Sequence, residues 1–296
     1  VVEPVMRPIN HHYVPQFLLA GWCRADGRLA VYSMKGGRLV VDWHAPKHTG
    51  YERNLYSLPT FPEAEKRGFD PQCVERFLMR DIDDAAAKVR LRLQSGDVAR
   101  LNEDDRVAWT RFLRALFYRS PTMVSALQQS FRQTFVEELE RDQADYEAMK
   151  EDWPLPDTWV EWHDTFMPGT EVGEIMLRGL PKLIDDAEEG DIIINMRWEV
   201  LDLTDSKFDL LTSDRPLILV DEPASRNCLI ALPLNPTRLF VASHYDRRFD
   251  CYPPDLIARR HNTSTVMEAH QRVYGTGAQH KPLVEKYLGR PVPNSA

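Results

Sequence analysis

The sequence predicts an α+β fold. An N-terminal β-hairpin and C-terminal antiparallel strands form one sheet, and a central helical block packs on it. Two β-prone runs flank a Gly-Gly pair, apolar residues then recur at three- and four-residue steps, and short apolar runs return after residue 190. Strands, then helices, then strands is the order typical of α+β proteins. We expect a single domain over residues 1–296, because a lone hairpin is too small to be stable.

The hairpin is predicted within the N-terminal segment, residues 1–60. The runs 29–33 and 38–43 are rich in β-prone residues and enclose Gly36 and Gly37. Both central residues of a primed hairpin turn need positive φ, which glycine adopts without steric cost. The glycine pair therefore predicts a tight turn between two antiparallel strands.

The helical block is predicted over residues 70–190. Asp70 followed by Pro71 is a helix start, Asn102 begins a second helix, and Ser120 caps a third. Shorter helices are expected at 157–166 and 170–187, with a break at 167–169. The apolar face expected of the first helix comprises Val74, Phe77, Leu78, Ile82, Ala85 and Val89.

Strands are predicted again over residues 191–245. The runs are 192–200, 208–211, 217–220, 229–234 and 238–242. Their connections are too short for a parallel crossover, so the pairing is expected to be antiparallel. The segment 255–290 is predicted to hold C-terminal helices at 255–274 and 282–288.

Composition excludes some classes of function. Lys plus Arg is 37 and Asp plus Glu is 45, which gives a formal net charge of −8. A protein that coats DNA would carry a cationic face instead. No run approaches the ~18 apolar residues of a membrane-spanning helix, so no membrane partner is expected. The four cysteines are far apart and the first residues lack a secretion-signal layout, which favours a cytoplasmic protein with reduced thiols.

Adjacent histidines stand near the start, at His11 and His12, followed by Gln16. In an extended segment they point to opposite sides, so one imidazole can act as base or ligand while the other supports it. The alternative is a hydrogen-bonded pair that anchors the N-terminal segment. The residues alone leave both interpretations open.

The chain resembles a bacterial family, domain of unknown function 4238. The opening run from His11 to Leu19 is similar to its HHxxPxFxL signature. Further matches occur in the same order along most of the chain, and the resemblance supplies positions but no reaction. They are Asn54-Leu55-Tyr56, Arg119-Ser120-Pro121, Thr212-Ser213-Asp214-Arg215-Pro216, Leu232-Pro233-Leu234-Asn235-Pro236, and Asn262 ahead of Val273-Tyr274.

These positions define the candidate site. Asp214 is predicted to orient His11 or His12 and raise its basicity, unless it accepts backbone amides in a turn. Arg119 is a candidate clamp for an anion, or a cation at a helix C-terminus. The other candidates for substrate binding are Asn54, which also suits a turn, Gln16 and Asn262.

The metal content is undetermined, although a divalent metal is compatible with the histidines. His44 and His48 are spaced for one helical face, but Pro46 between them disfavours a helix. The opening also resembles nucleases of the HNH type. After Asn54, however, the next histidine is His163, which is too distant for that compact unit.

Two classes of function therefore remain. The first is a hydrolase in which His11, His12 and Asp214 activate water against a phosphate-containing substrate, as in a phosphodiesterase or nuclease. The substrate is a small molecule or a nucleic acid. The second is a non-catalytic binding or effector module in which the His-Asp cluster is structural.

Overall fold

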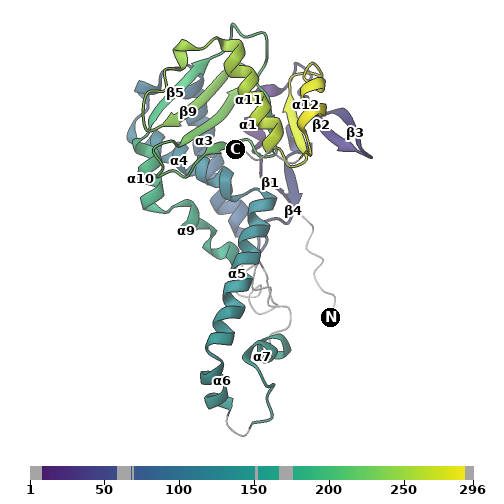
Figure 1. Ribbon diagram of the computed structural model, residues 1–296, viewed down its shortest axis with the longest axis vertical. Coiled ribbons are helices and arrows are strands. Elements are labelled where there is room, and N and C mark those ends of the chain that lie inside the picture. Colours follow the sequence, from purple (N-terminus) through teal and green to yellow (C-terminus); the bar gives the residue numbers. More distant parts are fainter. Residues whose placement is uncertain (1–8, 59–67, 69, 151–152, 167–175, 291–296) are drawn as a thin grey trace.

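The computed structural model describes residues 9–58, 68, 70–150, 153–166 and 176–290. Helices and antiparallel strands alternate around a central helical block, which confirms the predicted class (Figure 1). The predicted break at 167–169 and the first part of the predicted helix 170–187 lie outside the described residues. Within the part of the chain that is described, no helix is long and apolar enough to cross a membrane.

The described strands divide into three sheets, whereas the sequence predicts one. Strand β2 has β3 on one edge and β10 on the other, and β10 then pairs with β6. The hairpin therefore pairs with a C-terminal strand, as predicted. Because β3 and β10 occupy both edges of β2, the strands β5, β7, β8 and β9 form a separate sheet. The sheets are β1 (Asn10–His12) with β4 (Tyr51–Arg53); β3 (Arg38–His44), β2 (Leu29–Lys35), β10 (Arg272–Gly275) and β6 (Thr212–Ser213); and β5 (Arg197–Asp202), β9 (Arg238–Ser243), β8 (Leu229–Asn235) and β7 (Ile218–Val220).

Two helices of the central block begin where their caps predict, whereas the helix expected at Asp70 and Pro71 begins only with η3 at Val74, after a turn. Asn102 and Asp105 form a reciprocal capping box at the start of α4, and the Ser120 hydroxyl accepts the Met123 amide at the start of α5. The helical elements are α1 (Gln16–Leu19), η1 (Ala20–Trp22), η2 (Pro46–His48), η3 (Val74–Met79), α3 (Arg80–Gln94), η4 (Val98–Arg100), α4 (Glu103–Tyr118), α5 (Pro121–Arg141), α6 (Gln143–Lys150), α7 (Trp159–Phe166), η5 (Met176–Gly179), α9 (Leu180–Ile184), α10 (Ala187–Asn195), η6 (Phe249–Cys251), α11 (Pro254–Glu268) and α12 (Lys281–Tyr287).

Four local predictions differ from the structure. Residues 208–211 are not a strand, and the short strand β6 begins after them at Thr212. The apolar run 192–194 belongs to helix α10 rather than to a strand, and residues 272–275 form strand β10 rather than the end of a helix. The segment η3 is π-helical, so Val74 and Met79 are buried five residues apart while Phe77 is 65% exposed. A π-turn widens the helix to an i→i+5 repeat and rotates the expected apolar face.

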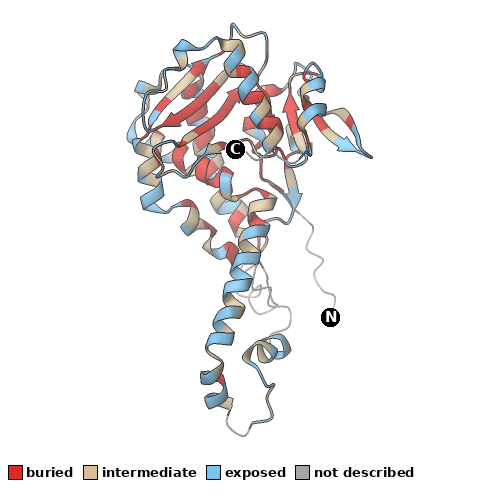
Figure 2. Cartoon of the chain, viewed as in Figure 1, coloured by how far each residue is buried: buried red, intermediate tan, exposed pale blue. Residues whose placement is uncertain are grey.

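Buried residues concentrate between the helical block and the two larger sheets (Figure 2). Helix α5 extends away from this body, and α6 and α7 lie at its far end (Figure 1). The outer part of α5 is mostly exposed, as its charged sequence predicts.

Gly50 provides a test of the packing beneath β1. It has a φ of +66°, and a Cβ there would lie 3.1 Å from the Val14 Cβ and 3.3 Å from the Leu19 Cδ1. Gly37 has a φ of +76° but open space around it. We expect Gly50→Ala to lower the free energy of unfolding by about 2–4 kcal/mol and Gly37→Ala by about 1 kcal/mol. Urea unfolding of both variants measures this, and equal losses would contradict it.

Candidate functional site

Strand β1 carries both signature histidines, and its pairing with β4 fixes their directions. His11 lies opposite Glu52 and His12 opposite Tyr51. Neighbouring side chains of a strand point to opposite faces. His11 is therefore fully buried, while His12 is half-buried on the other face.

Both ring nitrogens of His11 have partners. The Tyr56 amide donates to Nδ1 at 2.8 Å, and Nε2 lies 2.6 Å from the Gln72 Oε1. Because Nδ1 accepts, the proton is on Nε2 and is donated to Gln72. Burial lowers the pKa of His11, and the Gln72 hydrogen bond opposes this shift. His11 is a neutral anchor with no free nitrogen for a substrate.

Tyr56 connects this anchor to the end of α4. Its ring stacks on the His11 ring, with the centroids 5.3 Å apart, and its hydroxyl donates to the Arg119 carbonyl at 2.6 Å. Burial raises the pKa of Tyr56 well above its usual value, so the hydroxyl keeps its proton. Strand β1 and the C-terminus of α4 are thereby held together.

Arg119 is fully buried at the C-cap of α4. Its Nη1 donates to the Asp83 Oδ1 at 2.8 Å, whereas its Nε and Nη2 have no hydrogen-bond partner among the described residues. Burial raises the pKa of Asp83, and the charge of Arg119 opposes that rise. A buried guanidinium with unused donors requires an explanation beyond packing.

His12 and Glu75 contribute two more unpartnered atoms beside Arg119. The His12 Nε2 and the Glu75 Oε2 are buried and have no hydrogen-bond partner within the described part of the chain. Burial lowers the pKa of His12, the Lys47 backbone opposes the shift, and the charge of Arg119 adds to it. Burial raises the pKa of Glu75 to about 7, against the charge of Arg119. We call His12, Glu75, Asp83 and Arg119 the polar cluster.

Asp214 binds backbone amides rather than a histidine. Its carboxylate accepts the amides of His270, Gln271 and Arg272 at 2.9, 2.7 and 2.9 Å, and so holds the turn between α11 and β10. Burial raises the pKa of Asp214, while the three amides oppose the rise. No hydrogen bond or ion pair joins it to His11 or His12 in the described structure. The expected His-Asp pairing is not what the structure brings together.

A cavity of about 70 Å³ lies beside Asp214, bordered by Tyr13 and Ser120. Ligand-binding clefts usually measure several hundred Å³. The opening next to Asp214 is thus too small for more than a few atoms.

The remaining predicted site residues are placed separately. Asn54 has a φ of +55°, and its side-chain oxygen accepts the Ile9 amide at 3.0 Å. It therefore serves as a turn residue, the alternative to a role in substrate binding. Asn262 is buried and uses both ends of its amide, accepting from the Leu211 amide and donating to the Asp209 carbonyl, each at 2.8 Å. Gln16 is exposed at the first position of α1.

Metal ligands are not gathered in the part of the chain that the structure describes. It contains no group of three or more His, Cys, Asp or Glu side chains that could hold a metal ion. His44 ends strand β3 and His48 lies in η2, so the two do not share a helix face.

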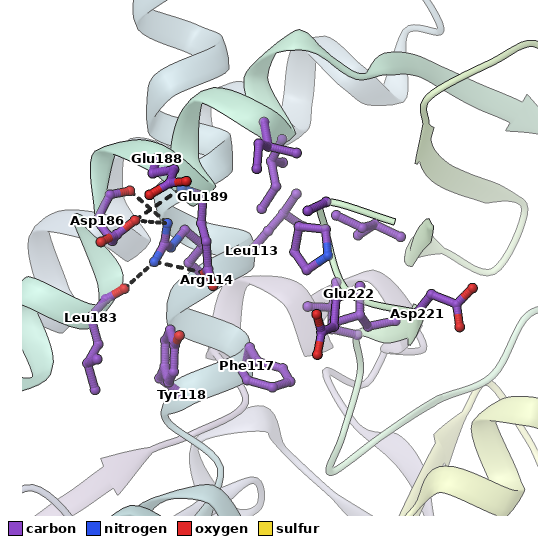
Figure 3. Close-up of a pocket in the computed structure, with 17 residues that line it drawn as sticks. Leu113, Arg114, Phe117, Tyr118, Leu183, Asp186, Glu188, Glu189, Asp221 and Glu222 are labelled. Carbon is purple, nitrogen blue, oxygen red and sulfur yellow. Dashed lines mark hydrogen bonds and ion pairs between the residues drawn. The ribbon is translucent and has the colours of Figure 1, made fainter. Parts of the chain in front are cut away.

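A larger cavity, of about 770 Å³, lies between α4, α10 and the β7 region (Figure 3). Arg114 on its wall donates to the carbonyls of Leu183 and Asp186 and lies 3.2 Å from the Glu189 Oε2. The other charged residues that line it are acidic: Asp186, Glu188, Glu189, Asp221 and Glu222. This lining does not suit a phosphate-containing substrate.

Sequence reasoning did not identify Glu75 or Asp83 as site residues. Both lie among polar residues at the start of a helical segment, where charged side chains usually face solvent. No signal in the sequence marks the π-turn, because the exposure of Phe77 appears only in the structure. Such turns occur frequently at functional sites.

Comparison with protein-family models gives one match. The model described as "Protein of unknown function (DUF4238)" matches residues 10–278. The chain belongs to the DUF4238 family. The match includes every residue of the polar cluster, and the family's description assigns no activity to it. No curated protein and no solved structure matches the chain.

The Asp214 clamp predicts a stability effect. We expect Asp214→Asn to lower the free energy of unfolding by about 2–3 kcal/mol, because an amide cannot accept all three N–H donors. The exposed Asp205→Asn substitution is the control, with a change below about 0.5 kcal/mol. Thermal and urea unfolding report both, and a wild-type stability of Asp214→Asn would contradict the clamp.

The raised pKa of Glu75 predicts a pH dependence. Between the ordinary value of 4.5 and about 7, the folded chain keeps a proton that the unfolded chain has released. The free energy of unfolding should therefore fall as the pH rises through this window, by about 3 kcal/mol at most. The Glu75→Gln variant should lose this pH dependence of the free energy of unfolding. The Glu52→Gln variant, changed at an exposed position, should retain it. Identical pH profiles of Glu75→Gln and wild type in urea unfolding would refute the assignment.

Proposed function

We propose that this DUF4238 chain is a hydrolase of phosphate esters that uses His12 as base, Glu75 as acid and Arg119 as phosphate ligand. The observation that carries the proposal is the set of four unpartnered buried atoms: His12 Nε2, Glu75 Oε2, and Arg119 Nε and Nη2. Unsatisfied buried polar atoms are rare in native proteins, and those that occur often have a catalytic or binding role.

The pKa values suit proton transfer near neutral pH. A lowered pKa keeps the His12 imidazole neutral and able to accept a proton from water. A pKa of about 7 leaves much of Glu75 protonated and able to donate. Two titratable groups whose environments set different protonation states are the usual basis for assigning base and acid.

Atoms and protons balance in the proposed reaction. Water loses a proton to the His12 Nε2 while its oxygen forms a bond to phosphorus. The bond from phosphorus to the ester oxygen breaks, and Glu75 gives its proton to the departing alkoxide. Proton transfer from the His12 imidazolium to the Glu75 carboxylate, through water, then restores both groups.

Arg119 would stabilise the negative charge on the phosphoryl oxygens. Its Nε and Nη2 donors lie on one edge of the guanidinium, which matches two phosphate oxygens. Asp83 fixes the guanidinium through Nη1 and leaves that edge unused. Because these atoms are buried, neighbouring side chains must shift when a substrate binds, as catalytic groups often do between free and bound states.

The second class, a non-catalytic module, is favoured by a different observation. His11, Asp214, Asn54 and Asn262 all direct their polar atoms at the chain's own backbone or side chains. In that case the signature residues would anchor the fold, and the polar cluster would be a strained structural feature.

Activity of variants separates these classes. With bis(p-nitrophenyl) phosphate as substrate, we expect His12→Ala to lower kcat by about 10²- to 10⁴-fold, the usual contribution of a general base. Nitrophenolate leaves without a proton, so we expect a similar loss for Glu75→Gln only with an alkyl ester such as glycerol 2-phosphate, measured by phosphate release. The exposed His48→Ala should retain wild-type activity. Unfolding measured on the same samples shows whether each variant is folded.

A wild-type chain that releases no nitrophenolate from this diester or from p-nitrophenyl phosphate would contradict the proposal. So would a folded His12→Ala variant that keeps full activity against the diester, or a folded Glu75→Gln variant that keeps full activity against the alkyl ester. Either result would support the non-catalytic module.

A further inference from the structure

A second cavity, of about 650 Å³, lies where α11 and α12 meet the segment before β6. Its volume is within the range of small-molecule sites. It shares no lining residue with the polar cluster, so a ligand bound there is independent of the proposed hydrolysis. The lining residues that bear on ligand binding are Lys207, Phe208, Arg259, His280, Lys286 and Tyr287.

The charge of this lining is opposite to that of the whole chain. Lys207, Arg259 and Lys286 line the cavity together with no acidic side chain. None of the three forms an ion pair with another described residue. The nearby carboxylate of Asp209 accepts hydrogen bonds from Thr276 and Gln279. In a chain with a net charge of −8, such a local excess of cations favours an anionic ligand.

Two aromatic rings stand beside the cations. The Arg259 Cζ lies 5.6 Å from the Phe208 ring centroid, and the Lys286 Nζ lies 4.9 Å from that of Tyr287. A ring paired with a cation presents a stacking surface next to a positive charge. A ligand that joins a planar ring to a phosphate can use both.

His280 lines the cavity from a fixed turn. The residue is 6% exposed, and its enclosed Nε2 has no hydrogen-bond partner in the described structure. The Tyr32 hydroxyl accepts the His280 amide at 3.3 Å and donates to the Gly277 carbonyl, so the turn that carries His280 is fixed.

We propose that this cavity binds a nucleotide, with the phosphate at Arg259 and Lys286 and the base against Phe208 or Tyr287. The proposal needs a ligand that combines ring and charge, because cations alone would hold any anion and rings alone any apolar molecule. The residues of α12 that contribute lie beyond residue 278, outside the region that the family model matches.

Isothermal titration calorimetry on the full chain tests it, with the four ribonucleoside 5′-monophosphates as probes. We expect at least one to bind with a Kd below about 1 mM, and at least about tenfold more tightly than its nucleoside and than inorganic phosphate. Binding should weaken as salt is raised. No nucleotide binding, or equal binding of phosphate alone, would overturn the proposal.

The chain offers a matched control for the variants. Arg259 and Arg260 are neighbours on α11, but Arg259 lines this cavity and Arg260 lines a different one. We expect Arg259→Ala to weaken nucleotide binding by about tenfold or more, and Arg260→Ala to leave it unchanged. Tyr287→Leu and Phe208→Leu, which keep an apolar side chain, show which ring stacks.

Equal effects of Arg259→Ala and Arg260→Ala would attribute binding to general surface charge and overturn the site. Full binding by both ring variants would overturn the role of stacking. Thermal unfolding of each variant confirms that a loss of binding is not a loss of fold. His12→Ala should bind nucleotide normally, because the two sites are separate.

Discussion

The hydrogen bonds on the two sides of His11 are the constraint on which the candidate site depends. One ring nitrogen accepts the Tyr56 amide and the other donates to Gln72, so a single neutral side chain joins β1, the segment after β4 and the start of the helical block. Tyr56 extends this connection to Arg119. Because strand neighbours face opposite ways, fixing His11 inward also sets the direction of His12. The hydrogen bonds that anchor His11 therefore also orient the proposed base, His12.

The sequence predicted those parts of the fold that local chemistry determines. Gly36 and Gly37 form the hairpin turn at positive φ, and Asn102 and Ser120 begin their helices, because each effect involves residues adjacent in sequence. The run 192–194 was assigned to a strand, since a short apolar run has no periodicity that separates a buried strand from a helix. The division into separate sheets depends on β10 occupying the edge of β2, a contact between residues about 240 positions apart.

The candidate site was predictable only in part, because it too depends on contacts between residues far apart in the sequence. The motifs single out His12 and Arg119, and in the structure the charge of Arg119 acts on the pKa of His12. Asp214 was preferred as the acidic partner because an acid at a strand end is conspicuous. Glu75 was overlooked because a helical pattern gives no indication that a π-turn directs its side chain inward. Recognising it required the tertiary neighbours that bury it.

Charge balance explains why Glu75 is the group that holds a proton. The cluster contains one permanent cation, Arg119, which is fully buried, and two partly buried carboxyl groups, Asp83 and Glu75. Asp83 has the direct hydrogen bond to the guanidinium, so the cation compensates its charge first. A second carboxylate would leave a net negative charge away from water, which is costly, and protonation removes it. Burial lowers the pKa of His12, and the charge of Arg119 adds to this shift, which favours the neutral imidazole. In the proposed mechanism, a neutral imidazole accepts a proton and a carboxyl group with a pKa of about 7 gives one.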